Sequence, residues 1–180
     1  MKISNFFAFL FFLPALLCAQ TNKNVEDHQF TVNVLLPGVV YEHGISQNST
    51  LTAEATIGFA YRDSDFFGSG FGVYPIGKLQ YRHYYNFQRR LDLDKKISEN
   101  TGNYIAPTIG LQGGNAVLGD LDYSSDFFAV AGAVYGLQRV GNKGFSFRFE
   151  VGPAYFFDEF DDDFGLFVAI KLGWVVRKNR

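Results

Sequence analysis

Apolar and polar residues alternate along most of this chain, and the longest regular stretch runs from Phe145 to Phe157. Its odd-numbered positions are all apolar, whereas the even-numbered positions from 146 to 154 are polar or small. A period of two predicts a β-strand with one apolar face. The stretch is thirteen residues long, more than twice the usual length of a soluble strand. This length is typical of strands that cross a bilayer in a β-barrel.

The same alternation recurs in six further stretches. They are residues 51–62, 71–87, 103–112, 126–140 and 164–177, and a first stretch that begins at Phe30. In the first stretch the apolar phase changes after Pro37-Gly38, which predicts a bulge or a turn. Seven strands are therefore clear. Bacterial barrels have an even number of strands, so an eighth arises either from a division at Pro37-Gly38 or from a strand within residues 113–123. The expected fold is all-β, an antiparallel up-and-down transmembrane β-barrel with eight strands.

Three segments have the composition of connections between strands. Gly141 to Gly144 predicts a tight hairpin, and Asp158 to Asp163 is a short acidic connection. The segment from Asn86 to Gly102 is long, polar and charged. Because outer-membrane barrels have short periplasmic turns and longer outer loops, we expect this segment to be extracellular.

The small residues indicate which face of the sheet points inward. A soluble barrel such as a lipocalin would show the same period with its apolar face inside. Here, however, Gly58, Gly110 and Gly152 lie in the polar phase, where a narrow interior needs small side chains to make room for large ones. The apolar face would then contact lipid. Candidates for aromatic belts at the membrane interfaces, with ordinary strand packing as the alternative, are Tyr81, Tyr85, Phe87, Tyr155, Phe157 and Trp174.

With the polar face inside, charged side chains point into the lumen. Isolated charges there would be very costly, so we predict a structural network of ion pairs that fills the interior. An eight-stranded barrel is just wide enough for side chains to pack its interior, which argues against an open pore; a path for protons or ions is the alternative. The predicted lumen residues are Glu42, Glu54, Arg62, Lys78, Arg82, Arg148, Glu150 and Lys171.

The first nineteen residues have the features of a secretory signal peptide. Lys2 supplies a positive charge, residues 6–17 form an apolar run, and cleavage after Ala19 fits the pattern. The run is shorter than a membrane-spanning helix requires. Cys18 raises the alternative of a lipoprotein, although Leu17 occupies the position where lipid attachment favours a small residue. The expected division is a signal peptide over residues 1–19 and one barrel domain over residues 20–180, exported to the bacterial outer membrane.

Composition agrees with this assignment and excludes some functions. Without Lys2 the chain has 15 basic and 18 acidic residues, which gives no reason to expect nucleic-acid binding. Cys18 is the sole cysteine, so a mature chain would have no disulfide, no thiolate nucleophile and no cysteine-based zinc site. Aromatic residues make up 18% of the chain and glycine is frequent at 19 residues, as in outer-membrane barrels.

Two groups of residues are weak candidates for chemistry. His83 lies in the lipid-facing phase near Ser98 of the long loop, and a hydrolytic site needs such a base together with an orienting acid. No motif links the two residues. The acidic residues between Asp158 and Asp163 could gather calcium, but they do not have EF-hand spacing, and a solvated acidic turn is the simpler interpretation. We expect no enzyme activity, no cofactor and no bound metal.

Several short patterns along the mature chain carry a resemblance to a known family. They are Tyr41-Glu42, Ser49-x-Leu51, Tyr81-Arg-His-Tyr-Tyr85, Gly102-Asn-Tyr104, Tyr135-Gly-Leu-Gln138 and Leu172-Gly-Trp174. With them the chain resembles small outer-membrane β-barrel proteins of the Bacteroidota type, which are related in architecture to OmpA-like and OmpX-like barrels. The resemblance implies assembly by the barrel-insertion machinery and supplies no catalytic residue.

The expected function is that of a non-enzymatic integral outer-membrane barrel with a structural or surface-interaction role. We expect a monomer whose partners are outer-membrane lipid and lipopolysaccharide; Arg89-Arg90 and Lys95-Lys96 could meet the lipopolysaccharide phosphates, or form a solvated loop. The alternatives are a narrow channel for small solutes and a lipid-modifying enzyme of the outer leaflet.

Overall fold

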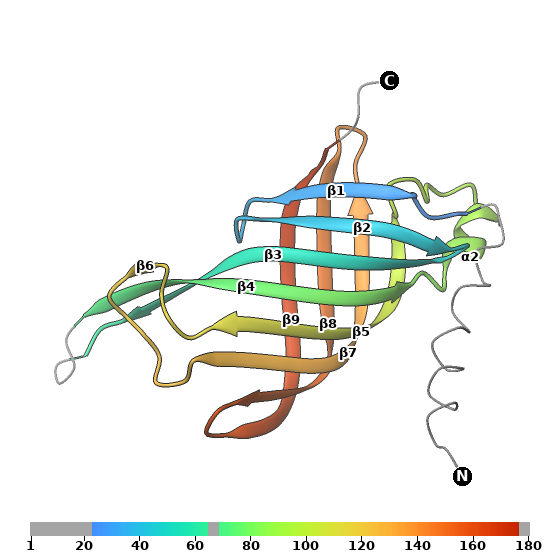
Figure 1. Cartoon of the computed structure of the whole chain (residues 1–180). Coiled ribbons are helices and arrows are strands. Elements are labelled where there is room, and N and C mark those ends of the chain that lie inside the picture. Colours follow the sequence, from blue (N-terminus) through green and yellow to red (C-terminus); the bar gives the residue numbers. More distant parts are fainter. Residues whose placement is uncertain (1–22, 65–68, 177–180) are drawn as a thin grey trace, which may run out of the picture.

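The computed structural model describes residues 23–64 and 69–176, and the predicted signal peptide lies outside these ranges. The described part is almost entirely β-structure (Figure 1). Its elements are β1 (His28–Asn33), β2 (Gly38–Ser46), β3 (Ser49–Arg62), β4 (Gly70–His83), α2 (Phe87–Leu91), β5 (Gly102–Gly113), β6 (Leu118–Gly119), β7 (Phe127–Val140), β8 (Phe145–Asp158) and β9 (Asp162–Val175).

Eight of these strands form a closed, barrel-like ring. Each pairs antiparallel with the next one along the chain, in the order β1, β2, β3, β4, β5, β7, β8, β9, and β9 pairs with β1 to close the ring. In Figure 1, β1 to β4 run side by side across the front while β8 and β9 cross behind them. The predicted antiparallel up-and-down arrangement of eight strands is therefore confirmed.

The eighth strand arises from the division at Pro37-Gly38. A turn over residues 34–37 separates β1 from β2, and the two strands pair from His28–His43 to Asn33–Gly38. The phase change in the sequence is thus a turn and not a bulge. After Gly113 ends β5, the segment up to residue 123 contains only the two-residue β6, which adds to β4 at Gly72 and Val73 and lies outside the ring.

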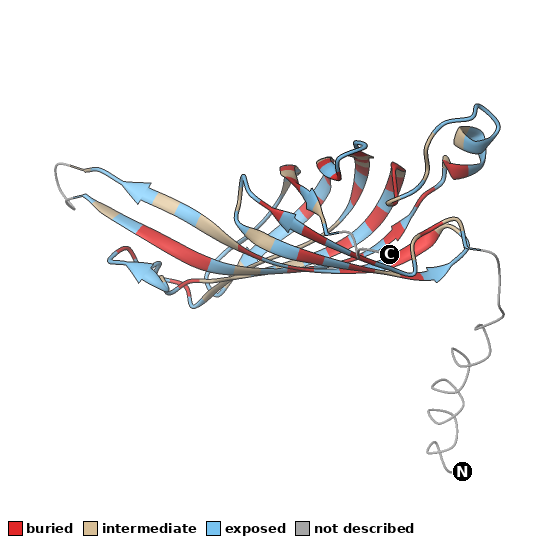
Figure 2. Ribbon diagram, turned by 90° about the horizontal axis from the view of Figure 1, so that it is seen from above, coloured by how far each residue is buried: buried red, intermediate tan, exposed pale blue. Residues whose placement is uncertain are grey.

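Burial alternates along the strands with the polar phase inside (Figure 2). On β3, Thr52 and Glu54 are buried while Leu51 is half exposed. The inward glycines are positions of close approach: a Cβ on Gly152 would strike the β7 backbone at Ala133. Among the described residues the buried set contains more polar and charged side chains than apolar ones, the reverse of a soluble core.

A cap of mainly apolar side chains closes one end of the ring, which we call the α2 end. Here the segment between β4 and β5, residues 84–101, folds across the interior. Phe87 is fully buried and stacks on Tyr84, with ring centroids 4.7 Å apart, and Tyr84 in turn meets the ring of Tyr104 edge-on. The prediction that Phe87 belongs to an outward aromatic belt is wrong, because the chain has left β4 at this point and α2 turns the ring inward. The other five candidates are exposed: Tyr81, Tyr85, Tyr155, Phe157 and Trp174.

Hydrogen bonds fasten this cap to the neighbouring strands. The Asn100 side chain accepts from the Glu26 backbone at 2.8 Å, and the Glu26 carboxylate accepts from the Glu99 backbone at 2.8 Å. Lys96 donates to the Val140 carbonyl at 2.9 Å. The long segment predicted to be an extracellular loop is therefore an ordered closure, at the end where β1 begins and β9 ends.

The opposite end, which we call the β6 end, is less regular. There β3 and β4 continue together as a ribbon beyond the last β2–β3 pair, Gly38 with Thr56, and β6 pairs with β4 along part of it. The acidic connection predicted near Asp158 joins β8 to β9 at this end. The tight hairpin of residues 141–144 lies at the α2 end, and Gly144 adopts a positive φ of 81° there, which glycine accepts without strain.

A substitution at Gly136 tests how tightly the interior is packed. It lies directly opposite Tyr104 on β5, and a Cβ at this position would overlap the buried Tyr104 ring. We expect Gly136→Ala to lower the free energy of unfolding by about 1–3 kcal/mol through overpacking, measured by urea unfolding of the folded protein. Gly77→Ala is the matched control, because a Cβ there meets nothing within 4 Å. Equal stability of the two variants would contradict a tightly packed lumen.

Candidate functional site

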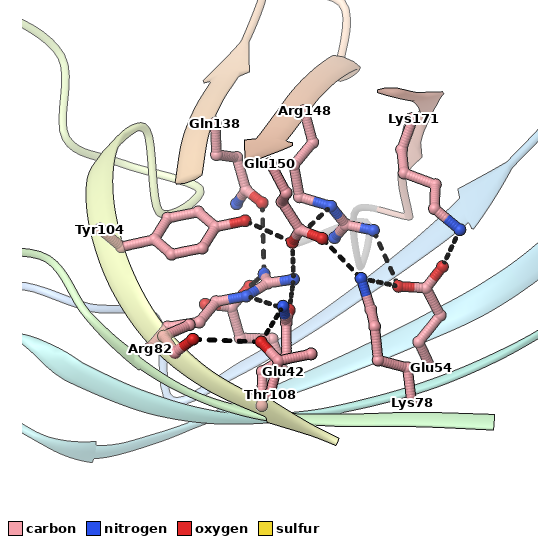
Figure 3. A network of polar contacts seen from close by, with 12 residues as sticks. Glu42, Glu54, Lys78, Arg82, Tyr104, Thr108, Gln138, Arg148, Glu150 and Lys171 are labelled. Atoms are coloured by element: carbon pink, nitrogen blue, oxygen red, sulfur yellow. Dashed lines mark hydrogen bonds and ion pairs between the residues drawn. The ribbon is translucent and has the colours of Figure 1, made fainter. Parts of the chain in front are cut away.

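The polar interior converges on one cluster of charged side chains (Figure 3). Seven of the eight predicted lumen residues belong to it, and all seven are buried: Glu42, Glu54, Lys78, Arg82, Arg148, Glu150 and Lys171. They come from β2, β3, β4, β8 and β9. Regular alternation accounts for this convergence, because every second side chain of each strand points into the same narrow space.

Glu54 is the anion with the most cationic partners. Lys171 donates to its Oε1 at 2.5 Å, and Arg148 and Lys78 lie 3.1 and 3.3 Å from its Oε2. Lys78 is the register partner of Glu54 on β4, whereas Arg148 and Lys171 are register partners of each other on β8 and β9. Glu54 therefore links two parts of the wall that are far apart in sequence.

Glu150 forms the second centre. Lys78 donates to its Oε2 at 2.6 Å, while Arg82 and Arg148 approach its Oε1 at 3.5 and 3.6 Å. The Tyr104 hydroxyl donates to the same Oε1 at 2.7 Å. Lys78 thus bridges the two carboxylates Glu54 and Glu150.

Arg82 extends the cluster toward the α2 cap. It donates to Glu42 at 3.0 Å and to Gln80 through two nitrogens at 3.0 and 2.8 Å. Its guanidinium also lies over the Tyr104 ring, 4.8 Å from the ring centre, a favourable cation–π arrangement. The second Glu42 oxygen accepts a hydrogen bond from the Tyr84 hydroxyl at 2.7 Å. Tyr84 therefore belongs both to the α2 cap and to the charge cluster.

Neutral residues complete the network, and the sequence prediction had left them out. Most of them form a hydrogen bond with a charged member directly, whereas Thr108 accepts one from the Gln80 amide. Tyr104 and Gln80 stand in the polar phase of their strands and could have been included on that signal. Tyr84 follows β4, so alternation could not place it. The neutral members include Asn33, Thr50, Gln80, Tyr84, Tyr104, Thr108 and Gln138.

Arg62 is the predicted lumen residue that lies outside the cluster. It is exposed and pairs in register with Gly70 in the β3–β4 ribbon. The polar phase of β3 does continue to Arg62, but β2 pairs with β3 only as far as Thr56. Arg62 lies near the far end of this ribbon, and its side chain is exposed, so the prediction for Arg62 is wrong.

The cluster is built to neutralise charge within the protein. Its seven members comprise four bases and three acids, and each carboxylate contacts at least one base within 3.5 Å. Buried ion pairs with additional hydrogen bonds are costly to disrupt on one side only. The ion pairs connect strands β2, β3, β4, β8 and β9 across the interior.

The histidines gather on the outer surface near the α2 end. The rings of His28 and His43 stack with centroids 4.8 Å apart. His83 Nδ1 lies 3.0 Å from Ser49 Oγ, which also accepts a hydrogen bond from the Tyr81 hydroxyl at 3.0 Å. The partner of His83 is therefore Ser49 and not the Ser98 that sequence reasoning suggested. No contact of the described residues puts a carboxylate on the His83 ring, which a catalytic triad requires.

Within 23–64 and 69–176, no three His, Cys, Asp or Glu side chains gather so as to hold a metal ion. No helix in these ranges is long and apolar enough to cross a membrane.

In comparisons with known proteins, no family model, no curated protein and no solved structure matches the chain.

Removing the Glu54 charge tests whether the cluster stabilises the fold. In Glu54→Gln the three bases Lys78, Arg148 and Lys171 lose a shared anion and stay buried, so we expect a loss of about 3–5 kcal/mol in the free energy of unfolding. Urea unfolding followed by gel mobility measures this loss.

Arg62→Gln is the control on the same strand. Its exposed position predicts no measurable change, since surface substitutions are usually near neutral. A Glu54→Gln variant as stable as Arg62→Gln would show that the cluster does not hold the ring together.

Proposed function

We propose that this protein is an integral β-barrel of the bacterial outer membrane, with a structural or surface-interaction role. The observation that carries the proposal is the inverted distribution of side chains. Large apolar residues cover the outer face of the ring, among them Leu79 at 55% and Ile109 at 56% exposed, while charged residues fill the interior. Water would penalise such a surface, whereas lipid matches it.

The spacing of aromatic side chains supports a membrane span. Tyr81 and Trp174 are exposed toward the α2 end, and Phe71 and Phe164 are exposed toward the β6 end. Ten residues separate Tyr81 from Phe71 along β4, which at the usual rise and tilt corresponds to roughly 25 Å across the wall. The apolar band of outer-membrane barrels has about this height.

The closed interior favours a structural or surface role over transport. Among the described residues, the buried charge cluster crosses the interior and the α2 cap lies over one end, and both features favour a closed interior over an aqueous path. A lipid-modifying enzyme is not favoured either, because Ser49 and His83 lack an orienting acid among the described residues. The resemblance to small barrels of the Bacteroidota type agrees with this role and implies insertion by the barrel-insertion machinery, with outer-membrane lipid and lipopolysaccharide as the partners of a monomer.

The membrane location predicts two properties of the expressed protein. It should stay with the outer-membrane fraction after a carbonate wash, and unboiled samples should migrate differently from boiled samples on a detergent gel, because closed barrels resist unfolding by detergent alone. Fractionation followed by paired gel lanes measures both. A monomer that is recovered in the soluble fraction and shows no mobility shift would contradict the proposal.

The blocked interior predicts the absence of ion conduction. Purified protein inserted into planar bilayers should give no steady, reproducible current steps under an applied voltage, since ions would have to cross a buried and neutralised charge cluster. A water-filled porin measured in parallel serves as the positive control. Steady channels with a reproducible conductance would instead support the alternative of a narrow solute channel.

A further inference from the structure

The wall of the ring is incomplete toward the β6 end. β1 pairs with β9 only from Thr31–Val175 to Asn33–Gly173, and the chain then turns back at residues 34–37 into β2. β9, however, continues to Asp162, and β3 continues beyond Thr56 without β2 as a neighbour. Between β9 and β3 the described wall therefore stops at the β1–β2 turn (Figure 1).

A cavity of about 380 Å³ occupies the interior at this height. Leu36 of the β1–β2 turn is one of the lining residues, so the cavity reaches the place where the wall between β9 and β3 stops. Its sides are mainly apolar and include Ile76, Phe128, Phe156 and Phe167. The volume is that of a small-ligand pocket.

The floor of the cavity is the edge of the charge cluster. Lys78, Lys171 and Glu54 all line it, which puts two ammonium groups beside one carboxylate. Lys171 donates to Glu54 at 2.5 Å, and this bond uses one of the three hydrogens that an ammonium group can donate. The cluster as a whole has four bases against three acids, so one further negative charge would balance it.

We propose that this cavity binds an amphiphilic monoanion: a molecule with one short apolar chain and a carboxylate or phosphodiester headgroup. The headgroup accepts hydrogen bonds from Lys171 and Lys78, and the chain lies against Phe128, Phe156 and Phe167. The two ammonium groups select against a cationic headgroup, and the apolar walls select for a molecule with an apolar chain. The site goes beyond the proposed membrane role and does not depend on it, since walls and floor belong to the fold itself.

The probes are octanoate and methyl octyl phosphate, with octyltrimethylammonium and 1-octanol as matched molecules of the same chain length. We expect isothermal titration of the folded protein, held in amphipathic polymer, to detect binding of at least one of the two anions, and at least tenfold weaker binding of the cation and the alcohol. Equal affinity for the anions and the cation, or binding of neither anion, would overturn the proposal.

Two variants locate the binding. Lys171→Gln leaves three bases and three acids in the cluster, so the variant should fold, and we expect at least tenfold weaker anion binding. Lys143→Gln, in the exposed turn at the α2 end, is the matched control and should bind as the unmodified protein does. Anion affinity unchanged in Lys171→Gln would overturn the assignment of the headgroup site.

Ala169→Leu tests the apolar part of the cavity independently. Ala169 lines the cavity, and a larger side chain there removes volume without changing charge, so we expect anion binding to be lost. Retained binding would overturn the proposal even if Lys171→Gln failed to fold. Gel mobility checks the fold of each variant, and fractionation tests the membrane location separately, so failure of one proposal is distinguishable from failure of the other.

Discussion

The neutralisation of buried charge is the constraint on which this structure depends. A carboxylate such as Glu54 cannot stay ionised in a narrow interior unless cations and hydrogen-bond donors surround it. Lys78, Arg148 and Lys171 meet it from three different strands. Satisfying this one side chain therefore fixes the distance between parts of the wall that the backbone ladder connects only indirectly.

The same cluster divides the interior into two unlike halves. Toward the α2 end, Glu42 and Glu150 accept hydrogen bonds from Tyr84 and Tyr104, and these rings belong to the apolar cap. Toward the β6 end, Lys78 and Lys171 form the floor of a cavity with aromatic walls. The closed half explains why conduction is not expected, and the open half offers a place where a ligand could meet two cations.

Strand length decides where the ring is enclosed. β1 is six residues long and β2 nine, whereas β3, β4, β7, β8 and β9 each have fourteen. The short hairpin closes the ring only near the charge cluster and the α2 end. This difference places Arg62 outside the interior, although its phase along β3 is the same as that of Glu54. It also leaves the wall incomplete beside the cavity.

The alternation in the sequence determined the strands, their inward phase and seven members of the charge cluster, because side-chain direction in a strand follows from position parity alone. The Gly residues in the polar phase likewise determined which face turns inward. Tertiary structure decided the rest. Phe87 became part of a cap, Tyr84 became a partner of Glu42, and Ser49 instead of Ser98 met His83. These outcomes depend on where connections fold and where neighbouring strands end, and parity along one strand contains no information about either.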